Sequence, residues 1–208
     1  MSEPNVLEAR GLVKRFGGLA ALDGVSFDLR PGEVHALCGE NGAGKSTLIK
    51  LLSGVHPHGS YEGEILLDGR PAAFRSTRDA ERAGIAIIHQ ELALFPEMSV
   101  GENLFLGALP RRDGRIDWDL VYALAATVLA ECGISLDPAA RLGDLGVGHQ
   151  QLVEIARAVS RRPRVLVLDE PTAALARHEI STLLDLVRRL RDRGVACVFI
   201  SHKLDEVF

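Results

Sequence analysis

A glycine-rich segment, Gly39–Thr47 (GENGAGKST), limits what this chain can fold into more than any other feature. It fits the pattern G-x-x-x-x-G-K-[S/T] and lies between an apolar run at 34–38 and a helical pattern that begins at Lys45. Glycines let a backbone wrap closely and point its N–H groups at phosphate oxygens. A helix N-terminus adds partial positive charge at the same point. The segment therefore predicts a phosphate-binding P-loop between a β-strand and an α-helix.

Two side chains of this loop have distinct expected roles. Lys45 is expected to reach the β- and γ-phosphates of a nucleotide, and the hydroxyl of Ser46 is expected to ligate Mg²⁺. The alternative is a glycine-rich turn without a ligand, which the four fixed positions and both flanks disfavour. The expected nucleotide-binding residues of the loop are Gly39, Glu40, Asn41, Gly42, Ala43, Gly44, Lys45, Ser46 and Thr47.

Composition limits the classes of protein to which the chain can belong. Its 208 residues, 47% hydrophobic and 25% charged, suit one globular domain or a domain with a subdomain. The net charge of −4 gives no support for nucleic acid as a partner. The N-terminus lacks a signal-peptide core, and no apolar run approaches the about 18 residues that span a bilayer. Any membrane role is therefore expected to come through a partner.

The three cysteines are far apart in the sequence, which fits a reducing cytosol. Cys38 and Cys197 lie in apolar runs, and we expect both to be buried core residues without a metal or redox role.

The hydrophobic pattern predicts an α/β fold. Apolar runs that suit strands buried on both faces alternate with helical patterns, which favours a parallel sheet covered on both sides. Near the N-terminus, shorter alternating runs and a hairpin around Asp68-Gly69-Arg70 predict a small antiparallel sheet. The buried strands are expected at 85–89, 165–168 and 196–200, and the helices at 98–106, 120–132, 150–161 and 178–193.

These elements suggest one P-loop domain with two additions. We expect an antiparallel β-subdomain over 1–35 and 60–75, and a helical subdomain without strands over 96–161. Phe16 is expected in a loop just before a glycine pair. The chain stops at Phe208, shortly after a helical pattern begins, so we expect 1–208 to be a truncated piece of a longer protein.

A second chemical motif is the apolar strand that ends in Asp169 and Glu170. At the carboxyl end of a strand near the P-loop, Asp169 is expected to hold Mg²⁺ through water. Glu170 is then placed to polarise the water that attacks the γ-phosphate. A strand that merely runs into an acidic turn is the alternative, and the upstream P-loop disfavours it.

Three weaker features follow other strands or precede a helix. Gln90 and His202 each come after a predicted strand, where either side chain can contact the γ-phosphate or is simply structural. The glycines of 145–151 expose backbone N–H groups before a helix. That stretch is either a second phosphate site or an ordinary helix-entry loop.

Taken in order, these motifs resemble those of ABC-transporter ATPases over essentially the whole chain. The resemblance implies a RecA-like parallel core that binds ATP with Mg²⁺, with Phe16 stacked on adenine and Gln90 acting as a further metal ligand and catalytic residue. It also assigns catalysis to Glu170 and His202, and a D-loop to 173–176. The signature loop of the family matches Leu145, Gly146, Val147, Gly148 and His149.

The closer resemblance is to monosaccharide importer ATPases that carry two cassettes in one polypeptide, of which this chain is similar to the first. Segments 84–107, 150–160 and 200–208 carry that likeness, and 56–65 with 143–156 are similar to D-xylose importers. The implied partners are a second cassette, membrane permease subunits and, indirectly, a periplasmic or extracellular sugar-binding protein. The implied location is the cytoplasmic face of the cell membrane, with 91–98 receiving a coupling helix of the permease.

The chain departs from the family pattern at Gly146, His149 and Ala176, where serine, glutamine and aspartate are usual. Family sites are composite, since the P-loop of one cassette faces the signature loop of the other. The resemblance implies that Gly146 faces a degenerate second site. The active site would then join this P-loop to a signature loop outside this chain.

Three alternatives remain open. Residues 202–205 superficially resemble the guanine-reading motif of P-loop GTPases, but the asparagine is missing. A non-transport ABC clamp in DNA repair or translation usually carries coiled-coil or basic insertions, and neither is present. The third alternative is a chain that binds ATP but turns it over slowly without the second cassette.

Overall fold

The computed structural model describes residues 4–40 and 42–201, which form two compact units. The first unit comprises residues up to 87, 163–170 and those from 187 onward, and the second comprises 88–162 and 171–186. The predicted helical region, 96–161, falls within the second unit, and the subdomain boundaries themselves stay a prediction.

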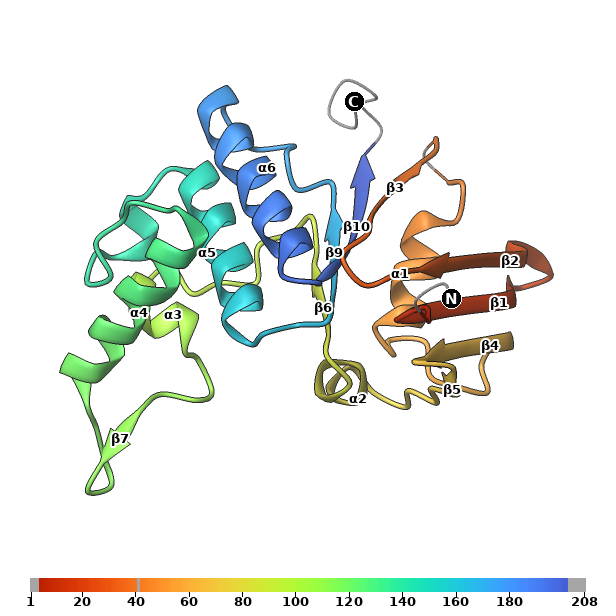
Figure 1. Cartoon of the computed structure of the whole chain (residues 1–208), viewed down its shortest axis with the longest axis horizontal. Helices are drawn as coiled ribbons and strands as arrows, with labels where there is room; N and C mark the ends of the chain where they lie inside the picture. The colour runs from red at the N-terminus through yellow and green to blue at the C-terminus, as the bar shows by residue number, and fades with distance from the viewer. Residues whose placement is uncertain (1–3, 41, 202–208) are drawn as a thin grey trace. The chain divides into compact units, whose positions relative to one another are not determined.

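A parallel sheet forms the core of the first unit. Its strand order is β3 (Val34–Cys38), β10 (Ala196–Ser201), β9 (Val165–Asp169) and β6 (Ile85–Ile88). Strand β10 runs parallel to both β3 and β9, and these three strands lie together in Figure 1. Side chains of β10 and most of β9 are buried, as strands covered on both faces require. The predicted α/β fold with a parallel sheet is confirmed.

An antiparallel sheet accompanies it, with the order β2 (Leu19–Leu29), β1 (Leu7–Phe16), β4 (Glu62–Leu67) and β5 (Arg70–Pro71). The predicted hairpin is present, although its second arm is shorter than expected. Asp68 and Gly69 both have positive φ angles, 49° and 72°, which are the angles of a type I′ turn. The Asp-Gly pair therefore sets this hairpin.

Two expectations about the first unit were wrong. Phe16 does not lie in a loop, because β1 continues past a register shift and ends at Phe16, opposite Leu19. Cys38 is exposed, whereas Cys132 and Cys197 are buried. Among the described strands β3 ends its sheet, and its exposure alternates along the strand, so Cys38 lies on the exposed face.

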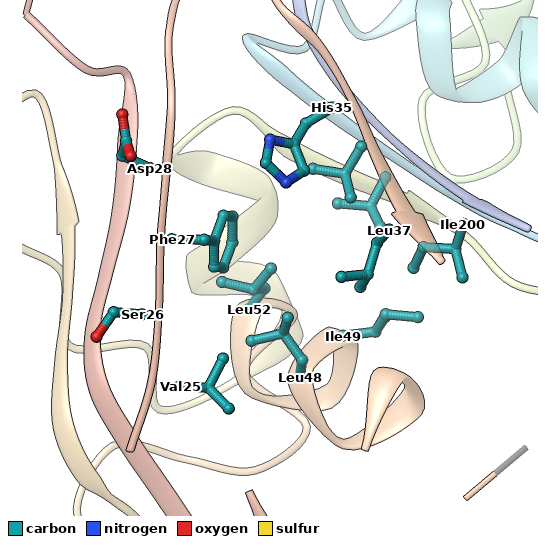
Figure 2. Close-up of a pocket in the computed structure, with 12 residues that line it drawn as sticks. Val25, Ser26, Phe27, Asp28, His35, Leu37, Leu48, Ile49, Leu52 and Ile200 are labelled. Atoms are coloured by element: carbon teal, nitrogen blue, oxygen red, sulfur yellow. The ribbon is translucent and has the colours of Figure 1, made fainter. Parts of the chain in front are cut away.

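The other face of β3 borders an apolar cavity of about 400 Å³, shown in Figure 2. His35 and Leu37 of β3 face side chains from the helix that follows the P-loop, α1 (Lys45–Leu52), and from β2. Hydrocarbon dominates the lining, so this cavity belongs to the core of the first unit and not to the phosphate loop. The lining residues are Val25, Ser26, Phe27, Asp28, His35, Leu37, Leu48, Ile49, Leu52, Val167, Val198 and Ile200.

The second unit is mainly helical. It contains α3 (Val100–Leu104), α4 (Trp118–Cys132), a 3₁₀ turn (Leu142–Asp144), α5 (Val147–Ser160) and the start of α6 (Arg177–Asp192). The sequence marks the ends of these helices. Ser99 and Glu102 form a capping box at α3, Asp117 caps α4, and Gly133 ends α4 in the left-handed conformation. None of the described helices has the length and apolar character that crossing a membrane requires.

Two elements were not anticipated from the sequence. A hairpin of β7 (Arg111–Arg112) and β8 (Arg115–Ile116) interrupts the helical region, which contradicts the expectation that it holds no strand. Strands of two residues are too short to show an alternating pattern. The helix α2 (Thr77–Arg82) was missed in the first unit because its single buried residue, Ala80, leaves no apolar stripe.

Candidate functional site

The glycine-rich loop connects β3 to α1 in the first unit. Gly42 and Gly44 have φ angles of 88° and 90°, in the left-handed region that favours glycine. A side chain at Gly44 would also meet the carbonyl oxygen of Ala21 at 2.5 Å. Gly44 is the N-cap of α1 and has no side chain with which to cap the helix, so the N-cap residue leaves the first N–H groups available to an anion.

The side chain of Lys45 lies across this loop. Its Nζ donates hydrogen bonds to the carbonyl oxygens of Gly39, at 2.5 Å, and Glu40, at 2.9 Å. The loop therefore presents an ammonium group together with the N-terminus of α1. Ser46 follows in the first turn of α1 and is exposed, so its hydroxyl is accessible to a ligand. This combination suits a polyphosphate.

The sheet brings the acidic pair to the same edge as the loop. In the parallel register, Ser201 of β10 lies opposite Cys38 of β3, and Ile200 lies opposite Asp169 of β9. Strand β10 therefore separates the loop strand from the acidic strand. Neighbouring strands are about 4.8 Å apart, so β3 and β9 are separated by about 10 Å. Asp169 and the loop therefore lie at the same edge of the sheet, two strands apart.

Glu170 has an unusual backbone conformation. Its φ angle is 49°, although it is not glycine, and its N–H donates to the carbonyl oxygen of Ile200 at 3.0 Å. A left-handed conformation outside glycine costs about 1–3 kcal/mol, and such conformations occur in turns, as at Asp68, and at functional sites. The chain thus turns sharply after β9 and leaves the Glu170 side chain partly exposed at the carboxyl edge of the sheet.

Phe16 offers an aromatic surface in the same unit. Its side chain is 46% exposed, its ring centroid is 5.4 Å from that of His56, and Lys14 Nζ lies 5.2 Å from the ring. The backbone N–H of His56 donates a hydrogen bond to the carbonyl oxygen of Lys50, near the end of α1. Burial, followed by the positive charges of Lys14 and Lys50, lowers the pKa of His56, so this imidazole is neutral at neutral pH. A flat exposed ring of this kind suits a nucleobase.

The donors in this unit fit a magnesium ion. A serine hydroxyl and an aspartate carboxylate are hard oxygen ligands, and Mg²⁺ usually takes one or two protein ligands together with substrate phosphates. Within residues 4–40 and 42–201 no group of three His, Cys, Asp or Glu side chains is arranged to hold a metal. Ser46 and Asp169 supply oxygen ligands of the kind that Mg²⁺ takes.

Several predicted site residues belong to the second unit. Gln90 follows β6 and is exposed, and Leu145–His149 lie before and at the start of α5. Their part in a site with the P-loop stays a prediction. Asn41 and His202 lie outside the described residues, so their roles stay predictions.

The predicted signature loop is partly helical. Helix α5 begins at Val147, three residues earlier than expected, because Gly146 serves as its N-cap. The N-cap Gly146 has no side chain with which to cap the helix, and Gly146 and Val147 are exposed. A second phosphate site at this helix start stays a prediction.

Glu179, at the start of α6, was missed by sequence reasoning. Its buried carboxylate accepts a hydrogen bond from Ala176 N at 2.7 Å and lies 3.6 Å from His149 Nδ1. It also packs so closely on Gly148 that no Cβ would fit there. A glutamate three residues after a helix N-cap was the available signal. Glu179 therefore joins the predicted D-loop to the predicted signature loop.

Glu154 of α5 was also missed. It is 8% exposed, and its Oε1 accepts a hydrogen bond from Ala93 N at 3.1 Å. Its other carboxylate oxygen is buried without a hydrogen-bond partner among the described residues. Burial raises the pKa of Glu154, against smaller lowering effects of the Ala93 hydrogen bond and the Arg157 charge. In the sequence, a single glutamate among apolar residues at helical spacing is only a weak indication of a buried carboxylate.

This burial makes stability depend on pH. The folded-state pKa of Glu154 is raised, so the folded chain retains this proton more strongly than the unfolded chain. Glu154 therefore contributes fully to stability at pH values below the ordinary pKa of glutamate. This contribution is lost as the pH rises through the raised pKa of the folded state. We expect Glu154→Gln to gain stability relative to wild type across that window, measured by urea unfolding at several pH values. If the difference in unfolding free energy between Glu154→Gln and wild type does not change with pH, this prediction is contradicted.

Comparison with known proteins agrees with the fold and with the loop. The sequence profile described as ABC transporter matches residues 22–173, which is most of the chain. The chain therefore belongs to the ABC transporter family. Its structure is similar to "the ADP conformation of MJ1267, an ATP-binding cassette of an ABC transporter", with a TM-score of 0.82 and 30% identity over 98% of this chain and 83% of that one. The protein cbiO1 of Clostridium perfringens gives a TM-score of 0.81 at 28% identity, over 99% of this chain and 81% of that one.

The curated relatives are more specific. The chain is 55% identical to the xylose import ATP-binding protein XylG of Moorella thermoacetica, over 98% of its own length. It is 52% identical to the proteins of the same name from Thermoanaerobacter pseudethanolicus and Escherichia coli O157:H7, each again over 98% of the chain. The chain spans about 40% of the length of these relatives.

Proposed function

We propose that this chain is an ATP-binding and ATP-hydrolysing cassette that powers import of a monosaccharide, D-xylose, through an ABC transporter. The observation that carries the proposal is the shared edge of the parallel sheet. There the P-loop follows β3, and Asp169 and Glu170 end β9, two strands away. The similarity to xylose import ATP-binding proteins supports the sugar.

Each group has a role in this proposal. The loop N–H groups and Lys45 bind the phosphates, while Phe16 stacks on adenine. Ser46 and Asp169 hold Mg²⁺, which neutralises charge that develops on the phosphates when it is bound. Glu170 accepts a proton from the attacking water, and His202 contacts that water and the γ-phosphate. Gln90 would be a further ligand of Mg²⁺ and would sense the γ-phosphate.

The site is completed by a second cassette. The signature loop of the partner cassette closes over the γ-phosphate bound at Lys45, while the loop of this chain faces the other site. The glycine at 146, with no side-chain cap on α5, fits a loop that faces a degenerate site. We accordingly propose that the 208-residue chain alone binds ATP and turns it over slowly.

The partners follow from the same proposal. Membrane permease subunits contact residues 91–98, and a sugar-binding protein outside the membrane delivers sugar to them. The cassette thus works at the cytoplasmic face of the membrane without crossing it. ATP binding closes the paired cassettes, and hydrolysis reopens them.

The decisive experiment is ATP hydrolysis by the complete reading frame assembled with its permease in lipid vesicles. We expect D-xylose with its binding protein to stimulate hydrolysis. In a competition assay we expect the protein to bind ATP in preference to GTP. The matched control is another pentose, such as L-arabinose, at the same concentration. A preference for GTP would support the GTPase alternative. ATP hydrolysis that no sugar stimulates, with no binding to the permease, would support the non-transport clamp.

A further inference from the structure

The backbone of segment 91–98 is held in place on one side by buried polar side chains of its own unit. Asn103 of α3, which is fully buried, donates to the carbonyl oxygen of Phe95 at 3.0 Å and accepts from Phe95 N at 2.8 Å. Gly143 N donates to the carbonyl oxygen of Pro96 at 2.9 Å. The side chain of Phe95 is nevertheless 50% exposed. A fixed backbone thus presents an exposed aromatic group.

Helix α5 holds the first part of this segment through a single peptide unit. Glu154 accepts from Ala93 N, and Arg157 Nη1 donates to the carbonyl oxygen of Ala93 at 2.8 Å. Residues three apart lie on one helix face, so both groups reach the same strip of chain. Both polar groups of the Ala93 backbone are therefore bonded to α5.

The chemistry of Glu154 indicates more than stabilisation. Ala93 is exposed, so water can satisfy its backbone groups without a buried carboxylate. Burying a carboxylate with one unpaired oxygen is unfavourable, and an apolar residue at this position would pack without that cost. What the carboxylate adds is a fixed orientation of the Ala93 peptide relative to α5.

Helix α5 connects this peptide to the predicted signature loop. Glu154 follows the helix start at Val147 by two turns, about 10 Å along the axis. The residues from Gln151 to Ala156 are all buried, so the middle of the helix is firmly packed within its unit. Because one continuous helix carries both the first turn and Glu154, a shift of the first turn would also move Ala93.

We infer that Glu154 and Arg157 are positioning residues, which clamp the Ala93 peptide so that the permease-facing segment moves with the signature helix. The inference rests on the proposed function, which makes 91–98 the surface that contacts the permease. It assigns to these two side chains the coupling of nucleotide state to sugar movement, and it assigns them no contact with ATP.

The test uses the complete transporter reconstituted in vesicles, with sugar-stimulated and basal ATP hydrolysis measured separately. We expect Glu154→Ala to lower the stimulated rate by about 2- to 30-fold, the range that coupling mutations span. The basal rate and the KM for ATP should stay near wild type. Glu154→Gln keeps the acceptor oxygen and should restore most of the stimulation. Glu131→Ala, which changes an exposed acid on α4, is the matched control and should behave as wild type.

A second measurement separates the clamp from a general loss of structure. Amide hydrogen exchange in 91–98 should accelerate in Glu154→Ala and Arg157→Ala, while exchange in α4 stays unchanged. Full stimulation in Glu154→Ala despite faster exchange at 91–98 would overturn the inference and leave the proposed function intact. An equal loss in basal and stimulated rates, or faster exchange throughout the unit, would show a merely structural role and overturn it too. If wild type shows no sugar stimulation, the proposed function fails and this inference fails with it.

Discussion

Glu170→Gln is expected to abolish ATP turnover while leaving ATP binding intact. Glutamine has almost the same shape as glutamate, but it cannot accept the proton of the attacking water. A general base usually contributes about 10²- to 10⁴-fold to the rate, so turnover should fall by that factor. The left-handed backbone at Glu170 should persist, because the hydrogen bond from its N–H to Ile200 does not involve the side chain.

Steady-state phosphate release and equilibrium binding of a fluorescent ATP analogue together test this prediction. The rate should collapse with Kd changed by less than about threefold, which is below 0.7 kcal/mol. The control is Glu62→Gln, which removes an exposed acid from β4 of the same unit and should change both quantities little. Unchanged turnover in Glu170→Gln would remove this residue from the role of general base. The measurement is best made with the second cassette present, since hydrolysis by this chain alone is expected to be slow.

Much of the first unit was predictable because its signals are local. The P-loop pattern predicts a strand before the loop and a helix after it, and the structure has β3 and α1 at these places. Apolar runs fixed β9 and β10, which are buried on both faces. The Asp-Gly pair at 68–69 fixed the hairpin through its backbone angles.

Strand order was not predictable from such signals. The sequence indicates that the acidic strand ends near the P-loop, but it does not indicate that β10, the last described strand, lies between β3 and β9. Placement of β10 depends on long-range pairing, and no local pattern encodes it. The same holds for Cys38, whose exposure depends on which strand ends the sheet.

Contacts between distant segments explain the missed polar residues. Glu154 and Glu179 look like ordinary surface glutamates in the sequence, because an ionised side chain on a helix is usually solvated. Only the packing of α5 against residues 61 positions earlier, and of α6 against Gly148, buries them. Periodicity predicts that a helix has a buried face, but it does not predict which polar side chain finds a partner there.

Lys45→Ala is expected to remove most of the affinity for ATP. The ammonium group already lies over the loop, within 2.9 Å of the carbonyl oxygens of Gly39 and Glu40, so it needs little rearrangement to reach a phosphate. A charge-assisted hydrogen bond contributes about 1.5–3 kcal/mol, which is about 10- to 150-fold in Kd.

Calorimetric titration of ATP into wild type and Lys45→Ala measures this loss directly. Lys45→Arg keeps the charge but replaces a compact ammonium group with a planar guanidinium, so we expect it to recover only part of the affinity. Lys50→Ala is the control, because it removes an exposed lysine from the last turn of the same helix. Equal affinity in Lys45→Ala and Lys50→Ala would mean that the backbone and the helix N-terminus bind the phosphates without Lys45. The hydrogen bond from Lys45 to Glu40 is exposed and the one to Gly39 is only partly buried, so the melting temperature without ATP should change little. A small change in melting temperature would separate lost binding from lost folding.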